Sequence, residues 1–337
     1  MTITVGLTHG YRTSGGGGNV NAGLLAGLEA NSRCEVRTFD PSAGPLPECD
    51  VVVCTGTKAV KVPGAKTVLW PLNVAPLEPA TVKLSARGPR ARVRYALLPH
   101  KLRRSIKKCD GLVFGSRYAA DLYRASFRQA RALPYAVVRT GMPSLPVADA
   151  PQPQPVPGRI LMVSHLYPYK LVVEAIEAME LVSRIVPGAH LRIAGRSTDK
   201  TYARRINDAM KGAAESVTLL GPLPPQDLLT EYSTAQVALL TSASENAGSF
   251  HLFDSAAFGL PIVASRESST PGVMGDAALL VDPYSPDDIA RGLLQVLQDA
   301  ACRTKLHNAS VEFAQAAPTW EQRAEELVAF CEELVAA

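Results

Sequence analysis

The stretch that decides the fold runs from Ile160 to Ile185 and reads ILMVSHLYPYKLVVEAIEAMELVSRI. Its first four residues, 160–163, form an apolar run, which is the pattern of a short buried strand. Residues 172–185 repeat apolar positions at helical spacing and predict an amphipathic helix. The segment between them carries His165 and Lys170. Strand, polar loop and helix in this order form the repeating unit of a parallel α/β sheet.

The same alternation continues on both sides of this stretch. On the C-terminal side we expect strands at 191–194, 217–219, 237–241, 262–264 and 278–281, with helices at 202–211, 227–232 and one ending near Phe258. On the N-terminal side we expect strands at 2–8, 35–39, 51–54, 67–70 and 111–114. The proline-rich stretch SLPVADAPQPQPVPG separates the two series and predicts an extended linker.

A chain of 337 residues fits about two domains. The predicted fold class is therefore α/β, with two doubly wound Rossmann-like domains facing a central cleft. We place the domains at 1–145 and 159–318, the linker at 146–158, and a final helix at 319–337. Ligands of such sheets bind outside the carboxyl ends of the strands, so the loops that follow strands are the candidate site.

A glycine run precedes the first predicted helix, at Gly15, Gly16, Gly17 and Gly18. Backbone amides in such a loop can cradle a phosphate or let an acceptor lie close. Four consecutive glycines do not match the dinucleotide fingerprint G-x-G-x-x-G. A flexible loop without a ligand is the alternative interpretation.

Three cationic or titratable side chains follow strand ends in the second series: His165, Lys170 and Arg196. An ammonium at the start of a helix can pair with a phosphate. The alternative for Lys170 is a surface lysine in a first helical turn, which costs only a few tenths of a kcal/mol.

The stretch SENAGSFHLFDSAAFGLPIVAS begins at Ser244 and holds two carboxylates, Glu245 and Asp254. Gly248 and Ser249 lie between them. Carboxylates separated by a small-residue loop, directly before a turn and an apolar strand, indicate a binding site more than packing.

The apolar runs and the cysteines of the sequence indicate where the protein is located and whether it holds a metal or disulfides. No run of about 18 apolar residues occurs, and the N-terminus lacks a basic head and apolar core, so we expect a cytoplasmic protein. The six cysteines form no Cys-x-x-Cys pair, which favours packed, reduced thiols over a zinc site or a disulfide framework.

The formal net charge is +4, but thirteen lysines and arginines between residues 87 and 131 face only Asp110 and Asp121. A solvated helix surface explains such a run. Nucleic acid is disfavoured, because few aromatic residues and no base-reading motif accompany it. An anionic membrane surface, on the inner face of the membrane, or an anionic or lipid-linked acceptor fits the same charge. We predict that Arg87 to Lys108 lies on one face of the N-terminal domain.

Together these segments resemble the retaining nucleotide-sugar glycosyltransferases of family four, the glycosyl transferases group 1 with GT-B architecture. The resemblance covers residues 158–337. It rests on Ser164 to Ala178, on the stretch that begins at Ser244, and on LRIAGRS, VTLLGPLPPQDLLTEYSTAQVALLTS, GDAALLVDP and TWEQRAEELVAF. The N-terminal half is similar more loosely, through DGLVFGSRYAADLY and VVRTGMPS.

The resemblance implies transfer of a sugar from a nucleoside diphosphate sugar, bound by the C-terminal domain, to an acceptor held by the N-terminal domain. It implies retention of anomeric configuration and a final helix that packs back on the first domain. The sequence contains no Asp-x-Asp motif, so we expect neither a metal nor another cofactor. A sugar-nucleotide epimerase of the same architecture and a non-catalytic sugar-nucleotide binder remain alternatives.

The resemblance also assigns residues to roles. Its signature is two glutamates separated by seven residues, the first meeting the donor sugar and the second the ribose. Glu245 takes the first place; Phe253 stands at the spacing of the second. Aligning DSAAFGLPIV on the following turn instead puts Asp254 in the ribose position. Glu245 and Lys170 are then the catalytic candidates.

The diphosphate contacts depart from the family pattern, because Ser164 and His165 replace the usual Gly-Arg. The phosphates would then depend on cationic side chains and backbone amides. The donor-binding candidates are His165, Lys170, Arg196, Gly221, Gly248, Ser249 and Phe250. Asn73 stands where many relatives carry a histidine on the acceptor side.

Overall fold

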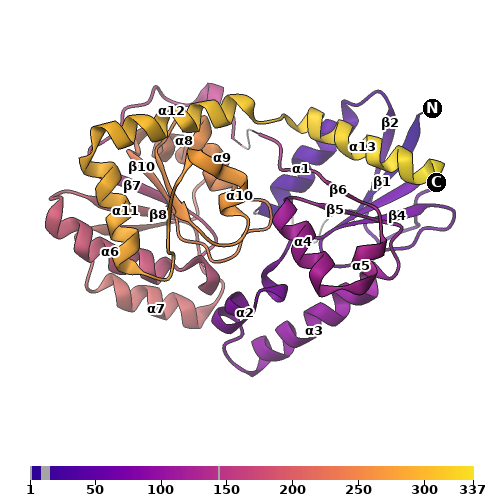
Figure 1. Cartoon of the computed structure of the whole chain (residues 1–337), viewed down its shortest axis with the longest axis horizontal. Coiled ribbons are helices and arrows are strands. Elements are labelled where there is room, and N and C mark those ends of the chain that lie inside the picture. Colours follow the sequence, from indigo (N-terminus) through magenta and orange to yellow (C-terminus); the bar gives the residue numbers. More distant parts are fainter. Residues whose placement is uncertain (1, 9–15, 143–144) are drawn as a thin grey trace. The chain divides into compact units, whose positions relative to one another are not determined.

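The computed structural model describes residues 2–8, 16–142 and 145–337. By its internal contacts the chain forms two compact units. Unit 1 comprises Met1–Met142, Glu245–Ala247 and Pro318–Ala337, and unit 2 comprises Pro143–Ser244 and Gly248–Ala317. Figure 1 shows a sheet with covering helices in each unit.

Unit 1 is built on a six-stranded sheet in the order β2-β1-β3-β4-β5-β6, in which every recorded pair is parallel. The strands are β1 (Ile3–Thr8), β2 (Cys34–Phe39), β3 (Val51–Thr55), β4 (Lys66–Trp70), β5 (Gly111–Phe114) and β6 (Tyr135–Val137). The helices are α1 (Gly16–Glu29), α2 (Pro79–Ser85), α3 (Pro89–Ile106), α4 (Arg117–Ser126), α5 (Arg128–Ala132) and α13 (Trp320–Ala336), with a 3-10 turn η1 (Ala75–Leu77).

The sheet of unit 1 is covered on both faces, as parallel sheets require. Along β3 the side chains of Val51 and Val53 join the core made with α1 and α13, whereas Val52 and Cys54 join the core made with α3 and α4. Successive side chains of a strand point to opposite faces, so one buried strand supplies both cores.

Helix α13 completes the first of these cores. It lies beside α1, and Figure 1 shows the two helices on the same side of the sheet. A Cβ on Gly23 would lie 2.2 Å from the indole of Trp320, and one on Gly27 would lie 2.4 Å from the Trp320 carbonyl oxygen. The glycines of α1 thus allow a close approach. Thr319 begins α13 with a capping box formed with Gln322.

Unit 2 has its own parallel sheet in the order β12-β11-β10-β7-β8-β9. The strands are β7 (Arg159–Val163), β8 (His190–Ala194), β9 (Val217–Gly221), β10 (Val237–Leu240), β11 (Ile262–Ser265) and β12 (Leu279–Val281). The helices are α6 (Val172–Ile185), α7 (Lys200–Met210), α8 (Pro225–Thr234), α9 (Phe250–Ala257), α10 (Thr270–Met274), α11 (Pro286–Gln298) and α12 (Ala300–Ala316). Short 3-10 turns are η2 (Val147–Asp149), η3 (Pro168–Lys170) and η4 (Gly275–Ala277).

The core of unit 2 lies between this sheet and the helices α6, α7 and α11. It contains Ile160, Leu191 and Val237 from the central strands and Ile176 from α6. Helix α8 covers the other face, where its Glu231 pairs with Arg192 of β8.

Two segments differ from the sequence-based expectations. Helix α1 begins at Gly16, so Gly16 to Gly18 form its first turn and not a loop before it; Gly15 lies outside the described residues. The first-turn amides of a helix have no intrahelical acceptor, and glycine accepts helical angles as it accepts others.

The proline-rich stretch is grouped with unit 2 and is bonded to it. Gln154 and Val156 donate their backbone N–H groups to the carbonyl oxygens of Ser233 and Thr234, at 2.8 and 2.9 Å. Prolines alternate with other residues here, and the residues between the prolines keep the donors that make these bonds.

Candidate functional site

The order of the strands in unit 2 identifies where a ligand should bind. From β7 the chain moves outward through β8 and β9, whereas β10, which pairs with β7, leads outward through β11 and β12. The loops that follow β7 and β10 therefore run in opposite directions, which defines the topological switch point of the sheet. The loop after β7 carries His165 and Lys170, and the loop after β10 leads to Glu245 and Gly248.

Backbone hydrogen bonds connect the loops after three neighbouring strands. Ser164 donates its N–H to the carbonyl oxygen of Ala194 at 2.9 Å, and Leu166 donates to that of Arg196 at 3.0 Å. Gly195 donates to Gly221 at 2.8 Å. These bonds bring the predicted residues His165, Arg196 and Gly221 to one edge of the sheet.

The loop after β10 is fixed to the loop after β7 in the same way. Ala243 donates its N–H to the carbonyl oxygen of Tyr169 at 2.8 Å, and the Thr241 hydroxyl donates to that of Lys170 at 2.8 Å. Leu171, which follows Lys170, has a φ of 52° although it is not glycine. Such a conformation costs about 1 kcal/mol or more and persists where the surroundings enforce it. The hydroxyl of Thr241 also bonds to the carbonyl of Leu171, whose side chain is buried.

The loop after β7 contains a series of neighbouring aromatic rings that ends beside Lys170. The ring of His165 lies 6.0 Å from that of Tyr167, which stacks on Tyr169 at 5.7 Å. The Lys170 ammonium lies 5.4 Å from the centroid of the Tyr169 ring, a cation–π distance.

The glycine loop before α9 uses one of the three amides predicted to contact phosphate. Gly248 has a φ of 83° and donates its N–H to the hydroxyl oxygen of Ser269 at 3.0 Å. Ser249 is the N-cap residue of α9 and Phe250 its first residue. Their amides belong to the helix N-terminus, where backbone N–H groups favour an anion.

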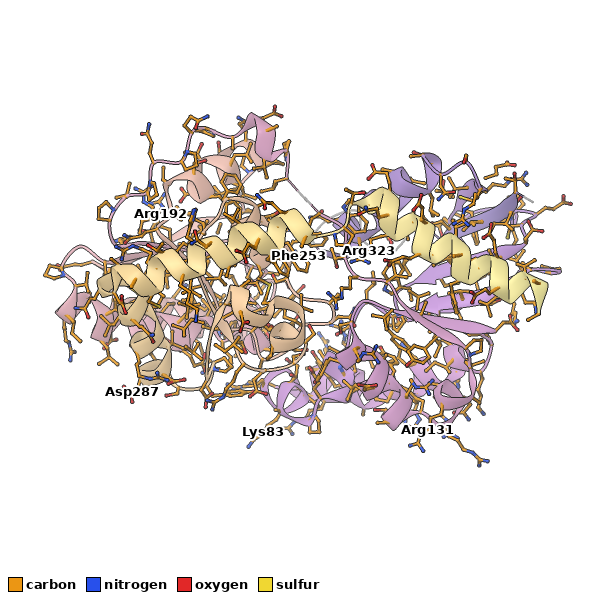
Figure 2. All side chains as sticks on the ribbon, turned by 45° about the horizontal axis from the view of Figure 1, so that its top comes forward. Lys83, Arg131, Arg192, Phe253, Asp287 and Arg323 are labelled. Carbon is orange, nitrogen blue, oxygen red and sulfur yellow. The ribbon has the colours of Figure 1, made fainter. Side chains whose placement is uncertain are left out.

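The two positions considered for the second carboxylate differ in their surroundings. Phe253 is buried and stacks on Phe313 of α12, with the ring centroids 6.1 Å apart. Figure 2 labels this side chain in unit 2. Asp254 is 4% exposed. Burial raises the pKa of Tyr232 well above its ordinary value, and the charge of Asp254 acts in the same direction. Phe253 therefore has a packing function, whereas Asp254 is a buried carboxylate.

Sequence reasoning missed a buried polar network on α9. His251 is 2% exposed; its Nε2 lies 3.2 Å from the Leu239 carbonyl oxygen, and its Nδ1 lies 3.0 Å from the Tyr232 hydroxyl. Nε2–H then donates to the carbonyl, and Nδ1 accepts from the tyrosine. Burial lowers the pKa of His251 to about 4, and the Lys170 charge acts in the same direction. The sequence signal that could have indicated this network is the place of His251 directly before the apolar Leu252 and Phe253 of α9.

The remaining predicted residues lie in unit 1. Glu245, in the segment grouped with that unit, is 9% exposed. Asn73 follows β4, and its side-chain oxygen accepts the backbone N–H of Ala75, the first residue of η1, at 3.0 Å.

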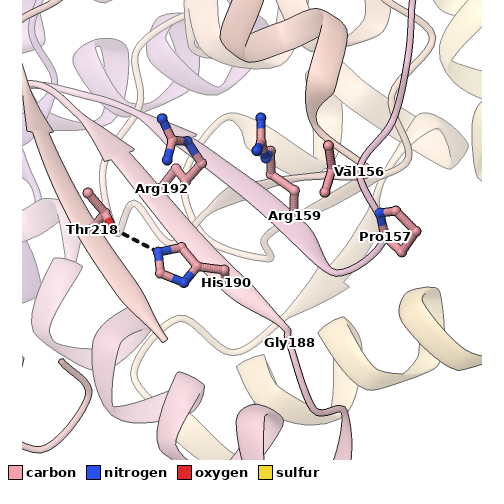
Figure 3. A pocket seen from close by; sticks show the side chains of 7 residues that line it. All are labelled: Val156, Pro157, Arg159, Gly188, His190, Arg192 and Thr218. Carbon is pink, nitrogen blue, oxygen red and sulfur yellow. Dashed lines mark hydrogen bonds between the residues drawn. The ribbon is translucent and has the colours of Figure 1, made fainter. Parts of the chain in front are cut away.

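A separate hollow of about 300 Å³ lies at the opposite edge of the unit 2 sheet, at the amino ends of β7 and β8. Figure 3 shows Arg159, Arg192, His190 and Thr218 around it. His190 and Thr218 bond to each other at 2.7 Å, and Arg192 pairs with Glu231. Arg159 donates to the Thr234 hydroxyl at 2.7 Å, so each of these four side chains already has a partner. No residue predicted to bind the donor lines the hollow.

Several classes of site find no support in the described part of the chain. There, no three His, Cys, Asp or Glu side chains are grouped so as to hold a metal ion. No described helix is long and apolar enough to cross a bilayer. All six cysteines are free thiols, and burial raises the pKa of Cys54 to about 11 and that of Cys109 to about 12.

Comparison with known proteins finds a family similarity in the second half of the chain. Residues 151–315 match the family model described as Glycosyl transferases group 1. A D-inositol 3-phosphate glycosyltransferase of Corynebacterium diphtheriae is 36% identical over 118 residues, covering 34% of this chain and 27% of the relative. An O-antigen chain mannosyltransferase B of Escherichia coli is 36% identical over 87 residues, covering 26% of this chain and 23% of the relative. The chain thus spans about a quarter of these relatives.

Solved structures match the chain over nearly its whole length. Sucrose-phosphate synthase from Thermosynechococcus elongatus has a TM-score of 0.74 at 17% identity, covering 99% of both chains. Anabaena Alr3699/HepE in complex with UDP-glucose has a TM-score of 0.70 at 14% identity, covering 97% of this chain and 99% of that one. The predicted fold class, α/β with two doubly wound Rossmann-like domains as in GT-B proteins, is confirmed.

Proposed function

We propose that this protein is a retaining, metal-independent glycosyltransferase of family four, which moves a sugar from a nucleoside diphosphate sugar to an acceptor. The observation that carries the proposal is the set of loops at the switch point of unit 2, where Lys170, Arg196 and the start of α9 follow neighbouring strands of a glycosyl transferases group 1 domain. Because Anabaena Alr3699/HepE was solved with UDP-glucose, we take UDP as the first nucleotide to test.

The chemistry assigns a task to each part of this site. When the bond between the anomeric carbon and the diphosphate breaks, negative charge develops on the diphosphate and positive charge on the sugar. Lys170 and the amides of Ser249 and Phe250 would stabilise the first, and the Glu245 carboxylate the second. Asp254 would accept from the ribose hydroxyls. The acceptor, anionic or lipid-linked, would bind unit 1 on the side of Asn73.

Three variants separate these roles. Lys170→Ala should weaken UDP binding about tenfold or more, because a charge-assisted contact contributes about 1.5–3 kcal/mol. Asp254→Asn should weaken UDP as well, whereas Glu245→Gln should leave UDP affinity nearly unchanged. Cleavage of the donor should fall about a hundredfold in Glu245→Gln, equal to about 2.7 kcal/mol of barrier. Calorimetric titration with UDP, beside the rate of UDP release from UDP-sugars, measures both quantities.

Exposed residues on helices α12 and α7 of unit 2 provide matched controls: Lys305→Ala, Asp208→Asn and Glu312→Gln make the same chemical changes outside the loops proposed to bind the donor. They should bind UDP and cleave the donor like the unaltered protein. Near-normal donor cleavage in Glu245→Gln, or unchanged UDP affinity in Asp254→Asn, would refute the assignment of these two carboxylates.

The same assays test the remaining parts of the proposal. Proton NMR of the product reports the anomeric configuration, and the rate in EDTA reports the need for a metal. An epimerase would convert the donor into a different sugar without any acceptor. A non-catalytic binder would hold the donor and leave it intact in the presence of any acceptor.

A further inference from the structure

Helix α3 in unit 1 carries an unusual outer face. Its sequence, PRARVRYALLPHKLRRSI, contains no acidic residue. Its inner side is anchored in the core through Leu102, Ser105 and Ile106, which are buried. The lysine and arginine side chains of the helix are all exposed to solvent, namely Arg90, Arg92, Arg94, Lys101, Arg103 and Arg104.

Apolar side chains occupy the middle of this outer face. Val93 is 59% exposed and Leu97 is 48% exposed, and both are among the large apolar side chains that the described part of the chain leaves in water. Four residues apart on a helix, they lie on the same side, one turn above the other. Helical spacing places Arg90, Arg94 and Lys101 along one flank of this pair and Arg92 and Arg103 along the other.

The cations of α3 form no ion pair with any carboxylate in the described part of the chain. The nearest acid in sequence, Asp110, pairs with Lys61 at 2.9 Å. Neighbouring segments add positive charge: Figure 2 shows Lys83 of α2 and Arg131 of α5 extending away from their helices. The surface is therefore positive without internal compensation.

We infer that the outer face of α3 docks unit 1 on an anionic lipid bilayer, with Val93 and Leu97 inserted among the headgroups and the flanking arginines and Lys101 against lipid phosphates. An apolar stripe flanked by cations is the pattern of helices that lie in the interface plane. A soluble polyanion would neutralise the cations but leave Val93 and Leu97 in water. The inference concerns adsorption of the protein and is independent of the transfer reaction.

Sedimentation with lipid vesicles tests the inference on the full-length chain without donor or acceptor. At about 0.1 M salt the protein should bind vesicles containing about 30 mol% phosphatidylglycerol at least about tenfold more tightly than pure phosphatidylcholine. Raising the salt to about 1 M should release most of it, because screening shortens the reach of exposed charges to about 3 Å.

Two sets of variants separate charge from insertion. Arg90→Gln/Arg94→Gln/Lys101→Gln should lower the affinity for anionic vesicles at least about tenfold. Val93→Ser/Leu97→Ser keeps every charge and should also lower it about tenfold. The control Arg204→Gln/Lys211→Gln/Lys305→Gln removes the same charge from exposed positions of unit 2 and should bind like the unaltered protein. Circular dichroism at matched concentration checks that each variant is folded.

A spectroscopic probe reports the depth of insertion directly. The chain has two tryptophans, so Leu97→Trp adds a third on the proposed contact face. Its fluorescence should be quenched by brominated phosphatidylglycerol vesicles beyond the quenching seen without the substitution.

Four results would overturn the inference: no binding to anionic vesicles at about 0.1 M salt, full binding by Val93→Ser/Leu97→Ser, equal losses in the unit 2 control, or capture by an acidic polysaccharide such as alginate without capture by vesicles. The last two would identify general surface charge and a soluble polyanion, respectively.

Discussion

Helices α9 and α3 both gather polar and charged side chains, but they hold them in opposite environments. On α9, His251, Asp254 and Ser255 are all less than 5% exposed, and His251 and Ser255 make hydrogen bonds to named partners. On α3 the cations are in solvent, and Val93 and Leu97 share that exposure. A buried group depends on the exact position of its partners, whereas exposed charges act through their sum. A single substitution on α9 should therefore have a large effect, whereas a single substitution on α3 should change the summed charge of that helix only slightly.

The largest expected effect is a loss of unfolding free energy, and it should appear when a histidine is replaced by alanine on α9 but not on α3. His251→Ala leaves the Tyr232 hydroxyl and the Leu239 carbonyl without a partner and opens a cavity, so unit 2 should lose about 3–5 kcal/mol of unfolding free energy. His100→Ala on the exposed face of α3 should change that of unit 1 by less than about 0.5 kcal/mol.

Calorimetry and hydrogen exchange can assign each loss to a unit. Both tryptophans, Trp70 and Trp320, belong to unit 1, so tryptophan fluorescence serves as the control that unit 1 is intact in His251→Ala. Equal stabilities of His251→Ala and His100→Ala would show that burial does not distinguish the two helices.

The second effect is a dependence of unit 2 stability on pH. His251 has a folded-state pKa of about 4, below its ordinary value near 6.5. Below pH 6.5 the unfolded chain binds a proton that the folded chain refuses, so stability falls as pH drops through this window and levels off near pH 4. The loss at pH 5 should be about 2 kcal/mol.

Denaturation of the unaltered protein and of His251→Asn at pH 7 and pH 5 measures the part of the stability loss that is due to His251. The groups near His251 are Tyr232, Asp254 and Lys170, and the variant leaves all three in place. The variant should lose less stability than the unaltered protein between the two pH values. An identical loss in both proteins would exclude His251 as its source.

The smallest effect lies between the two environments, at the ion pair of Arg192 and Glu231. Their side chains are 25% and 12% exposed, and two hydrogen bonds of 2.7 and 2.6 Å join them. Arg192→Met should destabilise unit 2 by about 1–2 kcal/mol, less than for a fully buried pair because solvent screens the carboxylate left behind. Urea denaturation measures the change.

A second substitution completes the cycle. Arg192→Met/Glu231→Met should regain most of the stability, since no charge is then left unpaired. The single variant Glu231→Met is measured as well. If the double variant loses as much stability as Arg192→Met and Glu231→Met lose together, the pair makes no specific contribution.

The strands of both sheets could be predicted where apolar residues run without interruption. The run at 160–163 became β7 and the run at 51–54 became β3, because strands buried on both faces need apolar residues at every position. Strand β6, Tyr135–Val137, was not predicted, since three residues at the edge of the sheet give no such run.

The hydrogen bonds within the candidate site were less accessible to sequence reasoning than the loops that form it. Strand ends and motif spacing indicate which loops matter, but not which amide is already used, as that of Gly248 is by Ser269. Nor could a pattern show that His251 of α9 would meet Tyr232 of α8, because that contact depends on tertiary packing. Nor could it show that the side-chain oxygen of Asn73, a residue predicted on the acceptor side, would accept the backbone N–H of Ala75.

The position of α13 has a consequence for how the protein is made. Ala324, Leu327 and Val328 belong to the core of unit 1, yet the ribosome synthesises them after all of unit 2. At about 5–20 residues per second, the roughly 200 residues that follow Met142 take about 10–40 s. Throughout this time α1 lacks the neighbour whose Trp320 packs against Gly23 and Gly27 in the folded protein. Chaperones that bind exposed apolar surface would therefore act on unit 1 until α13 is in place.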